Sequence, residues 1–116
     1  MTFERACSLD EFRDGEAVGA TIGDQDVAVA KDGDEIFAVE DTCSHASVAL
    51  SEGEVEGCTV ECWLHGSRFD LRTGKPTGLP ATEPVATFPL EIRANPDGTS
   101  DIYVDTTTTL NGVTPS

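Results

Sequence analysis

Two short cysteine–histidine pairs constrain this chain more than any other feature. The first pair is Cys43-Ser44-His45, and the second, after sixteen intervening residues, is Cys62-Trp63-Leu64-His65. Thiolate sulfur and imidazole nitrogen are ligands that proteins use for zinc and for iron–sulfur clusters. The four side chains therefore form a candidate metal site, which requires two loops to approach each other. Such a site would also stabilise a chain of 116 residues, which has room for only one modest core.

The order of the ligands bears on the kind of metal site. A zinc finger commonly pairs cysteine with cysteine and histidine with histidine within each local segment. Here each pair is mixed, which suits two loops that each give one thiolate and one imidazole to a binuclear iron–sulfur centre. A zinc-binding interaction module stays open as the alternative. His45 and His65 are the only histidines of the sequence. None is left for general-base work or for a mononuclear iron site, so we expect no catalytic residues.

The segments on either side of the pairs have the alternation and the turns of β-structure. We expect strands at residues 17–22, 25–31, 35–40, 91–94 and 101–104. Gly23-Asp24, Asp32-Gly33 and residues 95–98 provide the turns between them. Val27 and Val29 alternate with Asp26 and Ala28, which predicts a half-buried strand. Residues 8–11 have the form of a capping box and predict a short helical turn.

The pattern predicts one domain, residues 1–105, with an insertion. Residues 41–84 hold both cysteine–histidine pairs and are rich in glycine and proline, so we expect a two-loop metal-binding subdomain there. Residues 106–116 begin with four consecutive threonines and are low in complexity. We expect this tail to be disordered.

Charge and composition exclude several kinds of partner. The chain has 22 acidic and 7 basic residues and a net charge of −15, so nucleic acids and anionic membranes would be repelled. The acidity either steers a basic partner or reflects a proteome adapted to high salt. The sequence has no apolar stretch long enough to predict a membrane span, and its first residues do not have the apolar stretch of a leader peptide. We therefore expect a cytoplasmic protein. In that reducing compartment, Cys7 and Cys58 are expected to be buried and inert.

The pattern Cys-x-His followed by Cys-x-x-His resembles the Rieske [2Fe–2S] proteins. The resemblance extends to Gly66, Phe69 and Gly78-Leu79-Pro80, and covers about residues 2–105. It implies the Rieske fold: all-β, an antiparallel β-sandwich of short strands with an inserted two-loop cluster-binding subdomain. It also implies one [2Fe–2S] cluster, with the thiolates of Cys43 and Cys62 on the inner iron and the imidazoles of His45 and His65 on the outer iron.

Residues around the ligands would tune the cluster. In high-potential members of the family a serine and a tyrosine donate hydrogen bonds to sulfur, and two further cysteines form a disulfide. Here Ser67 matches the serine, Phe69 replaces the tyrosine, and Val48 and Leu64 replace the cysteines. The resemblance therefore implies a potential near the low end of the Rieske range of roughly −150 to +300 mV. Pro80 matches the proline loop that covers the cluster.

Trp63 and the two arginines after the second pair allow more than one role. Trp63 either shields the cluster, contacts a partner or packs the loop, and we favour packing. We expect Arg68 and Arg72 to pair locally with Asp70 or with glutamates 54, 56 and 61.

The resemblance implies a soluble one-electron carrier. It would take electrons from a flavin-dependent NAD(P)H reductase and pass them to an oxygenase, or to another redox client, with a basic docking face. Residues 51–58 and 61–67 also resemble small Rieske ferredoxins of iron–sulfur assembly systems. An accessory subunit like that of nitrite reductases is a further alternative.

Overall fold

The computed structural model describes residues 3–42, 48–63, 66–78 and 83–115. This part of the chain forms antiparallel sheets and two 3-10 turns, and contains no α-helix. The strands are β1 (Glu4–Ser8), β2 (Ala17–Ile22), β3 (Gln25–Asp32), β4 (Glu35–Glu40), β5 (Val55–Glu56), β6 (Thr59–Glu61), β7 (Arg68–Asp70), β8 (Thr87–Phe88), β9 (Leu90–Ala94) and β10 (Ser100–Val104), and the 3-10 turns are η1 (Leu9–Glu11) and η2 (Leu50–Glu52). The predicted all-β fold is confirmed. No helix in the described ranges is long and apolar enough to cross a bilayer.

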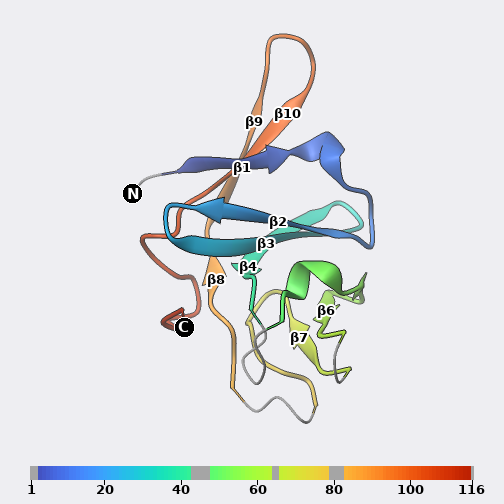
Figure 1. Ribbon diagram of the computed structural model, residues 1–116. Coiled ribbons are helices and arrows are strands. Elements are labelled where there is room, and N and C mark those ends of the chain that lie inside the picture. The colour runs from blue at the N-terminus through green and yellow to red at the C-terminus, as the bar shows by residue number, and fades with distance from the viewer. Residues whose placement is uncertain (1–2, 43–47, 64–65, 79–82, 116) are drawn as a thin grey trace.

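The strands form three small sheets in layers (Figure 1). Sheet A has the order β1-β10-β9, and sheet B has the order β2-β3-β4-β8. These two sheets pack on each other through a shared core that contains Val27, Val29, Phe88 and Ile102. Sheet C, of order β5-β6-β7, lies on the other side of sheet B and carries the second cysteine–histidine pair in the connection after β6.

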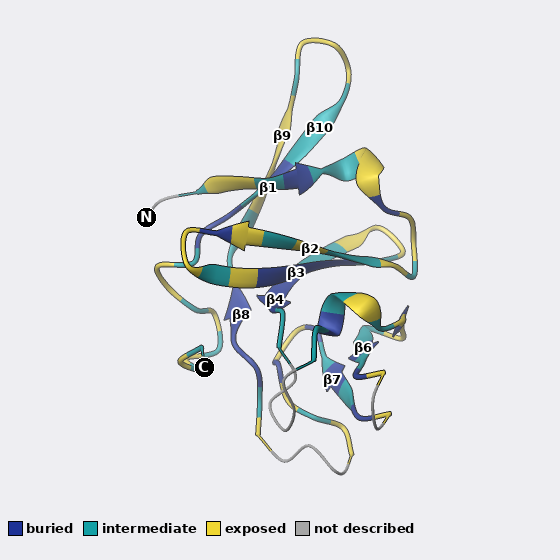
Figure 2. Ribbon diagram, in the orientation of Figure 1, coloured by how far each residue is buried: buried dark blue, intermediate teal, exposed yellow. Residues whose placement is uncertain are grey.

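Strand β3 is buried on both faces, not on one as predicted. Val27, Ala28, Val29 and Ala30 are each at most 1% exposed, and Figure 2 shows the middle of β3 in the colour of buried residues. The valines face the core with sheet A. The alanines face a second core, which holds Leu50, Val55, Val60, Phe69 and Leu71. Because alanine is small, η2 and sheet C can pack directly onto this face.

The predicted turns are present with small shifts. Ser8 caps η1 in a capping box with Glu11, as the sequence indicates. The β3–β4 hairpin turns at Gly33-Asp34, one residue later than expected, because β3 extends to Asp32. The β9–β10 hairpin projects beyond the rest of the molecule (Figure 1), and its turn occupies residues 95–99.

The inserted segment leaves and re-enters sheet B at adjacent strands. β4 pairs with β8, with Val39 opposite Thr87. The backbone N–H of Glu40 donates to the Ala86 carbonyl at 2.9 Å, and the Ala86 N–H donates to the Glu40 carboxylate at 2.8 Å. Glu40 is 3% exposed. The two ends of the inserted segment are therefore joined directly by these two hydrogen bonds.

The C-terminal tail, predicted to be disordered, makes defined contacts with the body. Residues 105–115 have no helix or strand, but the Leu110 N–H donates to the Thr87 carbonyl at 2.8 Å. Val113 packs against the core between sheets A and B. Contacts between the tail and distant strands cannot be predicted from the threonine-rich composition of the tail.

Candidate metal centre

Of the four predicted ligands, the structure describes Cys62. Cys43, His45 and His65 lie outside the described residues, as does Pro80. The described residues contain no group of three or more histidine, cysteine, aspartate or glutamate side chains able to hold a metal ion. The complete ligand set therefore stays a prediction, and Cys62 with its surroundings is the part of the site that the structure places.

Cys62 sits at the start of the connection between β6 and β7. Its N–H donates to the Ser67 carbonyl at 2.6 Å, and the Gly66 N–H donates to the Cys62 carbonyl at 2.9 Å. The strand register brings Glu61 opposite Arg68, so Cys62 and Ser67 face each other where β6 ends and β7 begins. Cys62 is fully buried and in no disulfide. A buried, unpaired thiol on a backbone fixed at both ends fits the role of a metal-binding thiolate.

The structure also places the three neighbours that the sequence singled out. Ser67 is 1% exposed, as a hydroxyl near a buried sulfur would be, and not a solvent-facing loop serine. Phe69 is fully buried in the core beneath sheet C. Trp63, by contrast, is 50% exposed. Half of the Trp63 surface is therefore open to a partner and half is covered, so packing of the loop, shielding of the cluster and contact with a partner all stay predictions.

The segment that follows the first pair contacts Glu61, the residue just before the second pair, through its backbone. The Glu61 N–H donates to the Glu54 carbonyl at 2.9 Å. A Cβ atom built on Gly53 would lie only 1.7 Å from the Glu61 carbonyl oxygen. Gly53 thus packs directly against the backbone of Glu61, the residue before Cys62.

A carboxylate fixes the two ends of the segment that carries the first pair. Asp41 accepts two hydrogen bonds from Ser51, from its N–H at 2.6 Å and from its hydroxyl at 2.7 Å. The Asp41 N–H donates to the Asp26 carbonyl on β3 at 3.0 Å. Burial raises the pKa of Asp41, and the two bonds from Ser51 oppose that shift. A Cβ atom on Gly19 would lie 2.9 Å from the Asp41 carboxylate and 3.0 Å from the Ser51 hydroxyl, so the pair packs closely against β2.

Sequence reasoning assigned no structural role to Asp41, Ser51 or Gly53, although Ser51 and Gly53 lie in the stretch 51–58 that resembles small Rieske ferredoxins. Their one available signal was position, since Asp41 follows a predicted strand and begins the loop-rich segment. Nothing in the sequence indicated that a serine ten residues away would return to it.

The two arginines after the second pair form one local and one distant ion pair. Arg68 lies 3.1 Å from Glu61 across the β6–β7 pair, as expected, and also donates to the Thr59 hydroxyl at 2.7 Å. Arg72 pairs with Glu35 at 2.8 Å, on a hairpin 37 residues away. The local pairing predicted for the Arg72 side chain is therefore wrong. Both sides of that pair are about half exposed, so it contributes little to stability.

The other two cysteines differ in burial. Cys7 is buried on β1, and burial raises its pKa to about 11. Cys58 is only partly buried, against expectation, and has a positive φ of 59°. Its N–H donates to the Asp32 carboxylate at 2.7 Å. Burial and the nearby Asp32 raise the Cys58 pKa, which disfavours the thiolate form.

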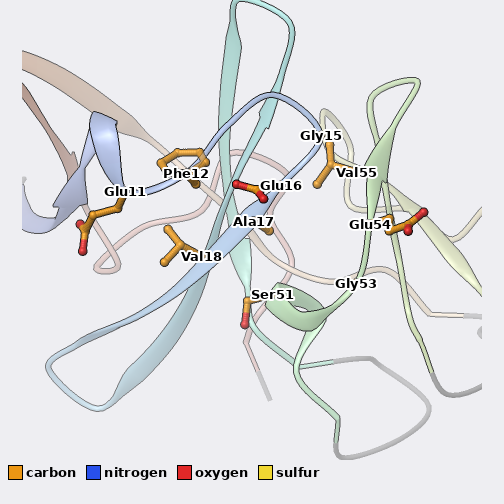
Figure 3. Close-up of a pocket in the computed structure, with 10 residues that line it drawn as sticks. All are labelled: Glu11, Phe12, Gly15, Glu16, Ala17, Val18, Ser51, Gly53, Glu54 and Val55. Atoms are coloured by element: carbon orange, nitrogen blue, oxygen red, sulfur yellow. The ribbon is translucent and has the colours of Figure 1, made fainter.

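An open groove lies between β2 and the η2 segment (Figure 3). Ser51 and Gly53 line one side, Ala17 and Val18 line the other, and the carboxylates of glutamates 11, 16 and 54 surround it. None of the predicted ligands lines this groove. We assign it no part in the metal centre.

Comparison with known proteins identifies the family. The Rieske [2Fe-2S] domain matches residues 2–89. The chain belongs to the Rieske [2Fe–2S] domain family. This Rieske chain is 46% identical over 85 residues to the anthranilate 1,2-dioxygenase ferredoxin subunit of Burkholderia cepacia, covering 73% of this chain and 79% of that subunit.

Solved Rieske structures agree with the fold. The ferredoxin of carbazole 1,9a-dioxygenase from Nocardioides aromaticivorans IC177 matches with a TM-score of 0.76 and 33% identity, over 90% of this chain and 97% of that one. A chain from a complex of reduced oxygenase and oxidized ferredoxin in carbazole 1,9a-dioxygenase matches with a TM-score of 0.73 and 32% identity, over 88% of this chain and 91% of that one.

Family membership confirms the predicted Rieske fold and the predicted cofactor. The cofactor of this domain is one Rieske-type [2Fe–2S] cluster, not zinc. The buried, unpaired Cys62 fits it, and the assignment of Cys43, His45 and His65 as the remaining ligands stays a prediction.

Proposed function

We propose that this Rieske protein is a one-electron carrier between a flavin-dependent NAD(P)H reductase and a terminal oxygenase. One observation carries the proposal: the chain matches a dioxygenase ferredoxin over 90% of its own length and 97% of that ferredoxin's length. The match to a chain from an oxygenase–ferredoxin complex supports an oxygenase as the electron acceptor. The proposed ligands are Cys43, His45, Cys62 and His65.

The described residues support this role through burial and exposure. When bound, the cluster supplies a centre that gains and loses one electron. Cys62 and Ser67 are withdrawn from water, so the chain excludes solvent from the ligand sulfur, and a backbone hydrogen bond of 2.6 Å joins the two residues. Trp63 is half exposed next to Cys62 and presents a large apolar surface where a partner would approach.

The charge of the chain supports a basic docking face on the partner. A net charge of −15 on 116 residues would speed encounter with a positively charged surface, and salt would weaken that effect. We further propose a cytoplasmic location. The described cysteines, Cys7, Cys58 and Cys62, are all free, as is usual in a reducing compartment.

Stopped-flow electron transfer tests the proposal. The purified red-brown protein should be reduced by NADH or NADPH through a flavin reductase and reoxidised by a terminal oxygenase that holds its aromatic substrate. The rate of both encounters should fall as ionic strength rises from about 0.01 to 0.15 M, where the Debye length shrinks from about 30 to about 8 Å. Trp63→Ala should slow transfer to the oxygenase, while Trp63→Phe should retain most of it.

Two results would contradict the proposal. A protein that is reduced chemically but exchanges no electrons with any reductase or oxygenase would not be a carrier. A midpoint potential above about +150 mV would contradict a low-potential Rieske centre.

A further inference from the structure

Asn111, in the C-terminal tail, uses all the hydrogen-bonding capacity of its side-chain amide. The Nδ2 group donates to the carbonyls of Thr73 and Val85, each at 2.8 Å. The Oδ1 atom accepts from the N–H groups of Thr87 and Val113, each at 3.2 Å. An amide has two donor hydrogens and two acceptor lone pairs, so this side chain is saturated.

The two donor bonds join both ends of one segment of the cluster-binding half. Thr73 and Val85 flank residues 74–84, of which the structure describes 74–78 and 83–84. This segment includes Pro80, whose match to the proline loop predicts that it covers the cluster. The Val85 N–H also donates to the Gly74 carbonyl at 2.8 Å, so the two ends already lie side by side.

Gly74 shows how closely the tail is packed here. A Cβ atom on Gly74 would lie 2.0 Å from the Val85 carbonyl oxygen and 2.7 Å from Asn111 Nδ2. Gly74 is buried and has a φ of +76°, which also favours glycine. The space for the Asn111 amide is therefore built into the segment.

The two acceptor bonds belong to a different part of the fold. Thr87 lies on β8, the edge strand of sheet B. The Leu110 N–H donates to the Thr87 carbonyl at 2.8 Å, so the tail runs along this edge. Val113 then packs into the core between sheets A and B. One side chain thus connects the base of the fold with both ends of the segment that carries Pro80.

We propose that the tail is a strap, and Asn111 a positioning residue, that holds the two ends of segment 74–84 together beside β8 and thereby slows loss of the cluster. The inference rests on the cluster assigned above and on no property of the redox partners. It gives the tail a role in retaining the cofactor.

The test compares three variants of the full, cluster-loaded chain. Asn111→Ala removes all four bonds. Asn111→Asp keeps the oxygen that accepts from β8 but replaces the donors with a carboxylate oxygen that faces two carbonyls. Asn95→Ala is the control, because Asn95 also donates two amide hydrogen bonds, to Thr99 and Asp101, entirely within the β9–β10 hairpin.

The readout is the rate at which the visible absorption of the cluster bleaches in the presence of an iron chelator. We expect Asn111→Ala and Asn111→Asp to bleach about tenfold faster than the parent, the effect of losing one to two net hydrogen bonds. Asn95→Ala should stay within about twofold of the parent, even where its melting temperature falls. Equal bleaching of Asn111→Asp and the parent would overturn the strap.

A second measurement separates strapping from tail docking. Hydrogen exchange of the Leu110 amide should remain slow in loaded Asn111→Asp, because the bonds to β8 are kept, and should become fast in Asn111→Ala. If Asn111→Ala fails to fold, Asn111→Asp alone decides the matter. These experiments need only the bound cluster, so failure of electron transfer with a reductase or oxygenase would leave their outcome unchanged.

Discussion

The contact between Gly53 and Glu61 gives the sharpest prediction about the metal centre. In Gly53→Ala the new methyl group would lie 1.7 Å from the Glu61 carbonyl oxygen and 2.8 Å from its carbonyl carbon. Ordinary contact begins at 3.4 Å. Both neighbours are backbone atoms, and Glu61 is further tied by its N–H bond to Glu54. Relief therefore requires the two ligand-bearing segments to separate.

Two opposite effects fix the sign of the change. Gly53 has a φ of −90° and a ψ of 173°, a conformation open to alanine. If the contact did not matter, Gly53→Ala would stabilise the fold by about 0.4–1 kcal/mol through the unfolded chain. The overlap instead costs about 1–3 kcal/mol, as for overpacked cores. We expect a net loss of stability. The shift needed at Glu61 also exceeds the roughly 0.2 Å tolerance of metal–ligand distances, so Cys62 should be displaced.

Thermal unfolding and visible circular dichroism measure the two consequences. Gly53→Ala should lower the melting temperature and alter the cluster spectrum, or be isolated with less iron. Gly98→Ala, in the β9–β10 turn, is the control. Gly98 has a φ of +91° and open space around it, so alanine there should lower stability through backbone strain and leave the cluster spectrum unchanged. A Gly53→Ala protein with parental stability and spectrum would refute the claim that this contact sets the spacing of the loops.

Four further changes follow from individual side chains. Ser51→Ala removes the hydrogen bond from the Ser51 hydroxyl to Asp41 and should lower the free energy of unfolding by about 1 kcal/mol, measured by thermal unfolding. An unchanged stability would show that this hydrogen bond does not stabilise the fold. Thr87→Val should stabilise the fold by about 1 kcal/mol in the same assay, because the Thr87 hydroxyl is the one buried side-chain polar atom in the described ranges without a hydrogen-bond partner. Ser67→Ala should lower the midpoint potential by roughly 60 mV in a redox titration, equivalent to about 1.4 kcal/mol for one electron; an unchanged potential would exclude Ser67. Burial raises the pKa of the Cys7 thiol to about 11. The buried neutral thiol therefore contributes fully to the free energy of unfolding below pH 9, and this contribution is lost as the pH rises through 11. Cys7→Ala should reduce the loss of stability over this range by on the order of 2 kcal/mol, measured by thermal unfolding at each pH.

The sequence allowed accurate prediction of the features that depend on local pattern. The hairpins around Gly23 and Gly98 and the capping box at Ser8 depend on neighbouring residues, and the structure has all of them. The cofactor was predictable because four residue types at fixed spacings are specific to it. Cys62 and Ser67 are buried as that interpretation requires.

Features that depend on distant contacts were not predictable. β3 was expected to be buried on one face. Its second face is buried as well, because the cluster-binding half packs against Ala28 and Ala30. Arg72 reaches Glu35 across 37 residues, and Asn111 reaches Thr73 across 38. Pairings at such separations are decided by the packed fold and leave no periodic signal in one sequence.

The junction at Glu40 and Ala86 has a consequence for how such proteins diversify. The strands on either side of the insertion are neighbours in sheet B, and the Glu40 backbone and carboxylate together close the gap. Pairing of β4 with β8 therefore brings the two ends of the insertion together whatever its length, and a longer or shorter insertion changes the entropy of loop closure only slightly. A recombined gene could exchange this half of the protein while the rest still folds. The redox properties of the inserted half and the stability of the two base sheets would then be inherited as separate parts.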